Sequence, residues 1–237
     1  MAIHDQHRRS FASDNYSGAH PDVMEAIVAA NGGHQSAYGY DDYTIALQEK
    51  MREQFGPRTE TFVVFNGTGA NVVALTAMMP RWGAVICSNL AHIETDEGGA
   101  PERVSGLKLF NVQHVHGKLT PESISTQVYD IGFEHRAQPM VVSITQTTEV
   151  GTVYTPSEIK AIADYCHENN LLLHLDGARI WNAAASLGVS FKEMISDTGV
   201  DVVSFGGTKN GVIAAEAVVV INPDAVDGLI YLRKMSM

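Results

Sequence analysis

The segment MVVSITQTTEVGTVYTPSEIKAIADYCHENNLLLHLD (residues 140–176) contains two apolar runs with a helical pattern between them. The apolar runs, MVVSITQ (140–146) and LLLHLD (171–176), have the length and composition of buried strands. The intervening part contains TPSE, a Thr-x-x-Glu pattern that is typical of a helix start. We therefore predict a strand–helix–strand unit in which the two strands are parallel and the helix (155–170) crosses one face of a sheet.

The same alternation extends over most of the chain. Apolar runs typical of strands lie at 61–65, 84–88, 107–112, 140–146, 171–176, 202–206 and 215–221. Helical patterns lie at 20–31, 43–55, 70–79, 119–129, 155–170 and 178–188. In the first of these, Val23, Ile27 and Ala30 fall on one side of an amphipathic helix. The repetition predicts an α/β fold with three layers, in which helices cover both faces of a mainly parallel sheet.

Composition and charge limit the classes of protein to consider. The chain has 237 residues, 45% hydrophobic and 18% charged, which excludes a disordered, collagenous or coiled-coil protein and suits one domain over 1–237. The formal net charge of −11 repels phosphate backbones and anionic lipids, so we expect no nucleic acid and no membrane partner. No apolar run is long enough for a membrane span, and MAIHDQHRRS at the N-terminus lacks the apolar core of a secretion signal. We expect a cytoplasmic protein in which Cys87 and Cys166 are reduced core thiols.

The residues that directly follow the strands are the candidates for a functional site, because ligands of parallel sheets bind at the carboxyl ends of strands. The run at 61–65 is followed by NGTGAN (66–71) and then by a helix. Free N–H groups at the helix start, together with the Thr68 hydroxyl, suit a phosphate group. A tight turn that requires glycine explains the same string equally well.

Asp176 ends a second buried strand and is followed closely by Arg179. A buried carboxylate needs a partner, since an isolated buried charge is expensive. Asp176 could cap the helix that follows, and Arg179 could pair with it or grip the carboxylate of a ligand with its planar fork. The sequence leaves these alternatives open.

Two further strand ends carry a lysine and a histidine. Lys209 lies within GGTKNG (206–211), where a ligand can approach closely, and its amine is either a nucleophile toward an aldehyde or a solvated loop amine. His92 is followed by Glu94, Asp96 and Glu97, but this spacing matches no common zinc site, so we predict no metal there. A ring stacked on a flat ligand, an acid–base group and a structural histidine all remain open.

Taken in order, these strings resemble those of the threonine aldolase / beta-eliminating lyase family. The resemblance is carried by FASDNYSGAHP (11–21), GHQSAYGYDD (33–42), FNGTGAN (65–71), AHIETDEGGAPE (91–102), KLTPESI (118–124), ITQTTEVGTVY (144–154), HLDGARIWNA (174–183) and FGGTKNG (205–211). It implies the large domain of the fold-type-I, aspartate aminotransferase-like fold, with pyridoxal 5'-phosphate as cofactor and residues 1–20 as an N-terminal arm. It also implies a smaller C-terminal domain, which we expect to be absent from this chain because the sequence stops where that domain should begin.

The resemblance assigns the cofactor-binding residues one by one. It implies that Lys209 attaches covalently to pyridoxal phosphate, and that Asp176 pairs with the pyridine nitrogen and keeps it protonated. His92 would stack on the ring and is the candidate base, although the family often has a second histidine where this chain has Glu149. The phosphate would be held by Gly67, Thr68 and Thr208.

The resemblance also assigns substrate-binding residues and an activity. Ser13 and Arg179 would hold the substrate carboxylate, and Tyr38 lies where the family has an active-site tyrosine. Arg233 matches an arginine that reaches the phosphate site of a neighbouring subunit. The implied reaction is aldol cleavage of L-threonine or L-allo-threonine to glycine and an aldehyde, in a homo-oligomer, tetramer or dimer.

Three functional hypotheses follow from this resemblance. The first is the threonine-type aldolase. The second keeps the cofactor but changes the reaction to beta-elimination, decarboxylation or transamination, because the orientation of the substrate decides which bond breaks. The third is a truncated, catalytically silent member of the family.

Overall fold

The computed structural model describes residues 3–236, and its seven strands form one sheet. Each strand lies within two residues of a predicted apolar run, so all seven strand predictions are confirmed. The strands are β1 (Glu60–Val64), β2 (Gly83–Ser88), β3 (Lys108–Val112), β4 (Gln138–Thr145), β5 (Leu172–Gly177), β6 (Val202–Gly206) and β7 (Glu216–Val220). Their order across the sheet is β1-β7-β6-β5-β4-β2-β3.

Among these seven strands, only β7 runs against the others. Strands β2 to β6 pair in parallel, whereas β7 is antiparallel to both of its neighbours, β1 and β6. The carboxyl ends of six strands therefore meet at one edge of the sheet, and the first residue of β7 lies at the same edge. The prediction of a mainly parallel sheet is confirmed.

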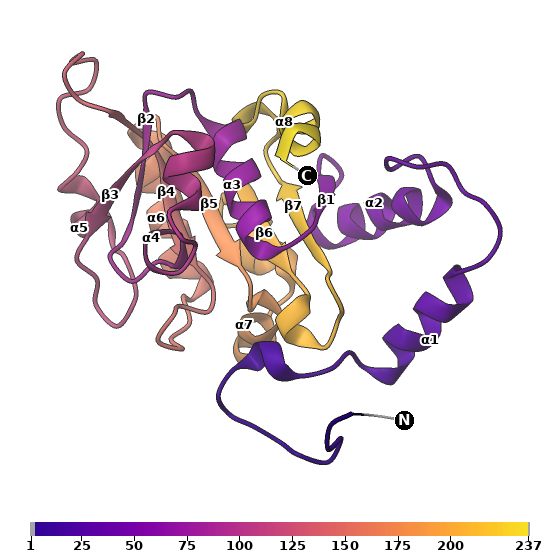
Figure 1. Cartoon of the computed structure of the whole chain (residues 1–237). Coiled ribbons are helices and arrows are strands. Elements are labelled where there is room, and N and C mark those ends of the chain that lie inside the picture. Colours follow the sequence, from indigo (N-terminus) through magenta and orange to yellow (C-terminus); the bar gives the residue numbers. More distant parts are fainter. Residues whose placement is uncertain (1–2, 237) are drawn as a thin grey trace.

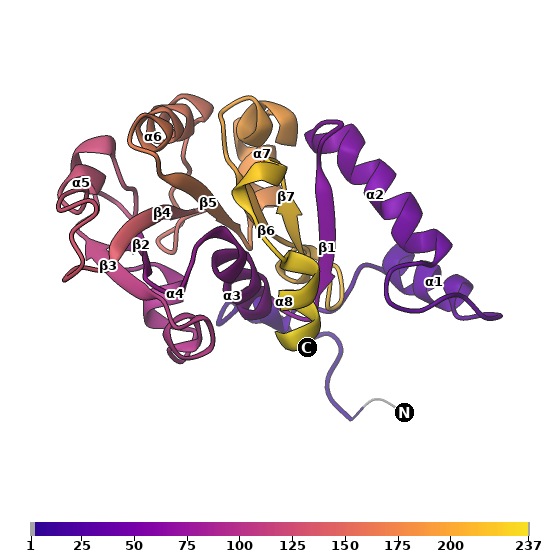
Figure 2. The ribbon, with the colours of Figure 1, turned by 90° about the horizontal axis from the view of Figure 1, so that it is seen from above.

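Helices cover both faces of the sheet and complete the three layers (Figures 1 and 2). The helices are α1 (Pro21–Ala30), α2 (Asp42–Phe55), α3 (Gly67–Met78), α4 (His92–Thr95), α5 (Pro121–Ser125), α6 (Pro156–Glu168), α7 (Ile180–Leu187) and α8 (Leu229–Ser236). Helices α3 and α8 pack on one face, in a core that includes Val73 and Val218. Helices α2, α6 and α7 pack on the other, in a core that includes Phe55, Ile159 and Ile180. The sheet is thus shielded from water on both sides, as parallel sheets require.

Local sequence accounts for where two of these helices begin and end. The predicted capping box of α6 is present, because Thr155 accepts the Glu158 N–H and Glu158 accepts the Thr155 N–H. Helix α5 is shorter than the predicted 119–129. Around its end Ser125 and Thr126 donate their hydroxyls to backbone carbonyls of the preceding turn, a side-chain bond that competes with helix continuation.

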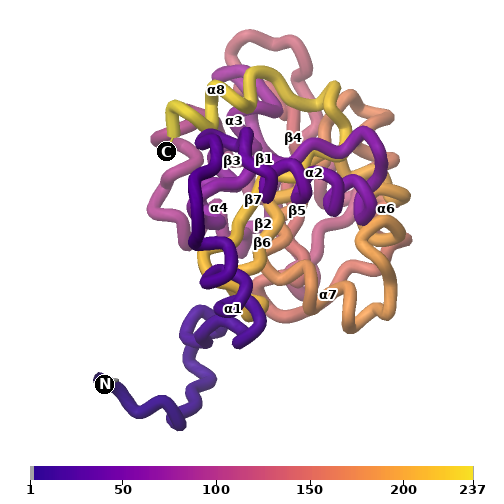
Figure 3. The backbone as a smooth tube through the Cα atoms, turned by 90° about the vertical axis from the view of Figure 1, so that its right-hand side faces the viewer, coloured from indigo at the N-terminus to yellow at the C-terminus, as the bar shows by residue number. Residues whose placement is uncertain are grey.

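The predicted amphipathic helix at 20–31 exists as α1, but none of its residues is buried. Ile27 and Val28 are 44% and 73% exposed, so the apolar face of α1 has no counterpart in the layers. Figure 3 shows α1 and the N-terminal segment extending away from the sheet. The pattern predicted the helix correctly, and on its predicted apolar side Val23 and Ala30 are half-buried, whereas Ile27 is exposed.

Both cysteines are unpaired and buried, as predicted. Burial raises the pKa of the Cys166 thiol to about 12, so this group stays protonated and packs as an apolar side chain. No helix within residues 3–236 has the length and apolar character needed to cross a bilayer.

Candidate active site

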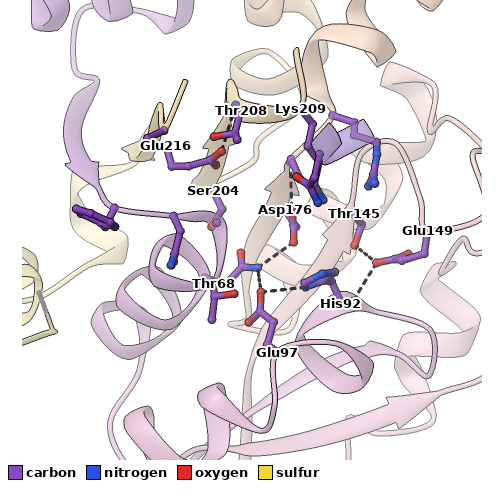
Figure 4. Close-up of a pocket in the computed structure, with 18 residues that line it drawn as sticks. Thr68, His92, Glu97, Thr145, Glu149, Asp176, Ser204, Thr208, Lys209 and Glu216 are labelled. Carbon is purple, nitrogen blue, oxygen red and sulfur yellow. Dashed lines mark hydrogen bonds and ion pairs between the residues drawn. The ribbon is translucent and has the colours of Figure 1, made fainter. Parts of the chain in front are cut away.

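A cavity of about 480 Å³ opens at the sheet edge where the strands end, and most of the predicted site residues line it (Figure 4). Those that line it are Gly67, Thr68, His92, Asp176, Arg179, Thr208 and Lys209. They are spread over 143 sequence positions, from 67 to 209, and meet because each follows the carboxyl end of a strand. The structure does not bring Ser13 or Tyr38 to the wall of this cavity.

One end of the cavity is built from glycines and threonines of two turns. Asn66 caps α3, where its side-chain oxygen accepts the Gly69 N–H at 2.7 Å, and Gly67 and Thr68 form the first turn of the helix. The end of β6 lies next to this turn and leads through Gly207 to Thr208 and Lys209. Apart from the Glu216 carboxylate, which accepts the Thr208 N–H, little side-chain bulk stands between a ligand and these backbone N–H groups, which suits an anion.

The end of β6 that carries Lys209 is held from two sides. The Trp181 indole N–H donates to the Gly206 carbonyl at 3.0 Å, and the Asn210 side chain donates to the Ala178 carbonyl at 3.3 Å. Both bonds join the turn after β6 to the segment that follows β5. The lysine and the carboxylate of Asp176 are therefore fixed relative to one another by the backbone.

A chain of buried side chains connects Asp176 with His92. The Asn71 amide donates to Asp176 at 2.9 Å and to Glu97 at 2.8 Å. The same Glu97 oxygen is 3.2 Å from Nδ1 of His92, as the dashed lines in Figure 4 show. Glu97 has a side-chain exposure of 1%, so this network fixes both the carboxylate and the ring in a low-dielectric environment.

Two titratable groups face the cavity with pKa values shifted in the same direction for different reasons. The hydrogen bond to Glu97 raises the pKa of His92 above its usual value and favours the protonated ring. Burial raises the pKa of Glu149, against the hydrogen bonds that it accepts from Thr145 and from the His92 backbone N–H. Perturbed groups gathered in one cavity are typical of a functional site.

Ser13 and Arg179, which were expected to hold the substrate carboxylate together, bind other groups of this chain. The Arg179 fork binds Asp14, with Nε to Oδ2 at 2.6 Å and a second bond at 3.1 Å, so its partner here is a carboxylate of this chain. The Ser13 hydroxyl accepts the Asn15 N–H and caps the short helix at 14–16. Arg179 thus binds a carboxylate in bidentate fashion, but this carboxylate belongs to Asp14 and not to a ligand.

The prediction that Tyr38 belongs to the site stays a prediction, because in a single copy of this chain Tyr38 does not line the cavity. Tyr38 is 76% exposed, and Lys234 lies over its ring at 4.7 Å from the centroid. The segment between α1 and α2 that carries Tyr38 is tied to the start of α2 rather than to the sheet, since Gln35 donates to Asp42. The prediction for Arg233 likewise stays untested, because within this chain its guanidinium lies 5.8 Å from the Phe62 ring centroid.

Several residues that line the cavity were not predicted from the sequence. They are Asn71, Thr145, Ser204 and Glu216. Asn71 lies one helical turn after Gly67, a periodicity that could have indicated its position. Glu216 is the first residue of β7. The segment 207–215 is shorter than the roughly a dozen residues that a parallel crossover requires, and this signal for an antiparallel strand could have revealed it.

The residues around Asp176 fit the predicted pyridoxal phosphate. Asp176 is 5% exposed and accepts hydrogen bonds only from neutral donors, the Asn71 amide and the Ala178 N–H. No lysine, arginine or histidine forms an ion pair with Asp176 within residues 3–236. A buried carboxylate of this kind is completed by a cationic donor such as a protonated pyridine nitrogen.

The sheet order, with Asp176 at the end of β5, Lys209 after β6 and a glycine-rich turn at α3, defines the large domain of a fold-type-I pyridoxal phosphate enzyme. Residues 10–236 match the family described as beta-eliminating lyase, and the chain belongs to this family. Because the family depends on pyridoxal phosphate, the predicted cofactor is confirmed.

Individual relatives agree with this family. The chain is 48% identical over 97% of its length to a low specificity L-threonine aldolase of Pseudomonas aeruginosa, of which it covers 67%. The structure of a Leishmania major threonine aldolase matches with a TM-score of 0.88 at 30% identity, over 94% of this chain and 65% of that one. A Thermus thermophilus aspartate aminotransferase variant matches with a TM-score of 0.69 at 15% identity, over 93% and 58%, which shows the shared fold alone. The chain thus spans about two thirds of the length of its relatives.

Proposed function

We propose that this protein cleaves β-hydroxy amino acids such as L-threonine and L-allo-threonine to glycine and an aldehyde. The observation that carries the proposal is the meeting of Lys209 and Asp176 in one cavity, in a chain that is 48% identical to a low specificity L-threonine aldolase. The reaction class is a carbon–carbon lyase.

The chain supplies groups for every part of the cofactor. Lys209 would attach covalently to it, and Asp176 would pair with its ring nitrogen and keep a proton there. His92, held in orientation by Glu97, would stack on the flat ring. Gly67, Thr68 and Thr208 would hold the phosphate. When bound, the cofactor supplies an electron sink for the electrons of the breaking bond.

Arg179 binds and orients the substrate through its carboxylate. Its two nitrogens already grip a carboxylate in bidentate fashion, and the substrate replaces Asp14 there. A displaced Asp14 would free the segment that carries Ser13, whose hydroxyl is the second predicted contact of the substrate carboxylate. This grip sets the rotation of the amino acid and hence which bond is broken.

We assign the proton acceptor for the β-hydroxyl to Glu149 rather than to His92. The hydrogen bond to Glu97 raises the pKa of His92 and favours the protonated ring, which can donate a proton but cannot accept one. Glu149 is acceptor-only when ionised, and burial raises its pKa, which makes it a stronger base than an exposed glutamate. His92 then serves as a donor next to the reacting atoms.

A second reaction class has one observation in its favour. The chain is 31% identical over 72% of its length to a Cochliobolus carbonum protein described as alanine racemase, so a related framework carries a different reaction. The products separate the hypotheses, since beta-elimination of L-threonine gives 2-oxobutyrate and ammonia, whereas aldol cleavage gives glycine and an aldehyde.

The cellular setting is part of the same proposal. Buried, reduced Cys87 and Cys166 support a cytoplasmic location, in a role of glycine supply or threonine breakdown. The exposed apolar side of α1 and the exposed Tyr38 support a homo-oligomer, a tetramer or dimer, in which a neighbouring copy covers these residues.

The experiment combines a spectrum with a product assay. We expect pyridoxal phosphate to give the chain a yellow colour, borohydride to trap the cofactor on Lys209, and L-threonine to release acetaldehyde. Lys209→Ala removes the trapped adduct, whereas the control Lys160→Ala, on the exposed face of α6, keeps it. A cofactor trapped on any other residue would refute the assignment of Lys209, and 2-oxobutyrate without glycine would refute the aldolase.

A further inference from the structure

The phosphate end of the cavity contains an acidic residue, Glu216. Glu216 begins β7 and pairs in register with Gly206 of β6 and Val64 of β1, so its backbone is fixed between two strand ends. Its Oε1 accepts the Thr208 N–H at 3.3 Å. Its Oε2 lies close to both glycine turns, 3.0 Å from where a Cβ on Gly206 would stand and 3.8 Å from one on Gly67.

A carboxylate at this place opposes the binding of a phosphate. The phosphate carries between about −1.5 and −2 charges near neutral pH, and it would approach the turn at which Glu216 accepts the Thr208 N–H. Like charges within a few ångströms of one another repel strongly in a partly buried site. Either the side chain leaves, or its charge is removed by a proton.

The other charges of the cavity do not compensate for a further anion. The groups that line it include four carboxyl groups against one arginine, one lysine and one histidine, namely Glu97, Glu149, Asp176 and Glu216 against Arg179, Lys209 and His92. Arg179 is already paired with Asp14. The charges that act most directly on Glu216 are Asp176, which disfavours its ionised form, and Lys209, which favours it.

We propose that Glu216 holds the cofactor phosphate as a neutral carboxylic acid, so that cofactor binding takes up a proton at this residue. The protonated carboxyl donates its O–H to a phosphate oxygen, while its other oxygen continues to accept the Thr208 N–H. The inference rests on the proposed function, because it takes the predicted phosphate site as its starting point.

The environment of Glu216 already favours the neutral form. Burial raises the pKa of this carboxyl above the usual value for glutamate, and the hydrogen bonds from Thr208 only partly oppose this. A phosphate nearby adds a negative charge and acts in the same direction as Asp176. The backbone pairing with two strands fixes the Cα of Glu216, and the bond from the Thr208 N–H holds its side chain at the turn. Protonation removes the repulsion without breaking this bond, whereas rotation of the side chain would break it.

The test compares pyridoxal phosphate with pyridoxal, which has the same aldehyde but lacks the phosphate. The dissociation constants of both are measured by visible absorption from mildly acidic to mildly alkaline pH. The preference is the ratio of the dissociation constant of pyridoxal to that of pyridoxal phosphate. For the wild-type chain we expect this ratio to fall by up to about tenfold for each unit by which the pH rises, because binding of the phosphorylated form takes up one proton. Glu216→Gln carries an amide donor that does not titrate, so its preference should change less with pH and exceed that of the wild type at alkaline pH.

Two comparisons make the outcome specific. Glu149→Gln alters a carboxyl group in the same cavity outside the phosphate end, and it should keep the wild-type pH dependence of the preference. In weakly buffered solution, wild-type protein should take up more protons with pyridoxal phosphate than with pyridoxal, which needs no variant to fold. Wild-type protein that binds neither aldehyde would refute the proposed function together with this inference. A wild type that binds both, with equal proton uptake or with the same pH dependence in Glu216→Gln, would refute the inference alone.

Discussion

At the scale of single residues, the site separates two groups that can move a proton at the substrate. His92 is bound to the buried Glu97, whereas Glu149 is bound only to Thr145 and to a backbone N–H. The first pairing favours a protonated ring, and the second leaves a desolvated carboxylate that can accept a proton. This difference, rather than residue type, decides which of the two acts as the base.

Replacement of Glu149 by Gln should lower kcat for L-threonine by about a hundred- to ten-thousand-fold, with a small change in KM, because the amide cannot accept the hydroxyl proton. In the wild type, burial raises the pKa of Glu149, so kcat should fall with decreasing pH at values above those of an ordinary glutamate. Steady-state kinetics across pH measures both effects. Glycine has no β-hydroxyl, and it should bind to Glu149→Gln with unchanged affinity. If kcat of Glu149→Gln still fell with decreasing pH as it does in the wild type, another group would be the base.

Asp14 occupies the Arg179 fork, and the hydrogen bond from Arg179 lowers the pKa of Asp14, so this carboxylate stays ionised at neutral pH. Asp14→Asn should lower the KM for threonine by less than about fivefold, since partly exposed ion pairs contribute little energy. Asp22→Asn, at an exposed aspartate of α1, is the matched control. A higher KM in Asp14→Asn would instead mean that Asp14 holds Arg179 in position for the substrate.

At the scale of elements, α6 is the crossover that the decisive sequence segment predicts, and its start depends on Thr155. Thr155→Ala removes the acceptor of the Glu158 N–H and should lower the free energy of unfolding by about 1 kcal/mol. Chemical denaturation measures this loss. Thr155→Ser keeps the hydroxyl and should retain most of the stability. If Thr155→Ser lost as much free energy of unfolding as Thr155→Ala, the capping role of Thr155 would be contradicted.

The elements also show which parts of the molecule the sequence could predict. Strand positions followed from apolar runs, and the positions of Asp176 and Lys209 followed from where two strands end. Glu216 escaped prediction because its place depends on the direction of β7, which a local hydrophobic pattern does not encode. The pairing of Arg179 with Asp14 joins residues that are 165 positions apart, and no local rule selects one carboxylate over another.

At the scale of the whole molecule, one buried histidine links the stability of the sheet to pH. His174 lies in the middle of the sheet with no exposed surface, and its ring nitrogens are 2.9 Å from the hydroxyls of Ser143 on β4 and Ser204 on β6. Burial lowers the pKa of His174 from 6.5 to about 4, although the negative charge of Asp176 acts to raise it. The folded chain therefore holds the ring neutral where the unfolded chain would protonate it.

The sign of the pH effect follows from this difference in proton binding. Between pH 6.5 and about 4 the unfolded chain binds more protons at His174 than the folded chain, so stability is complete above 6.5 and is lost as the pH falls toward 4. The loss amounts to about 3 kcal/mol. Gln has a donor and an acceptor for the two serines and does not titrate, so His174→Gln should unfold with a shallower acid dependence than the wild type. Urea unfolding at several pH values measures this acid dependence. His135→Gln, which replaces a histidine whose side chain is 75% exposed, is the control. If the free energy of unfolding of His174→Gln changed with pH as steeply as that of the wild type, the acid sensitivity of the fold would originate in groups other than His174.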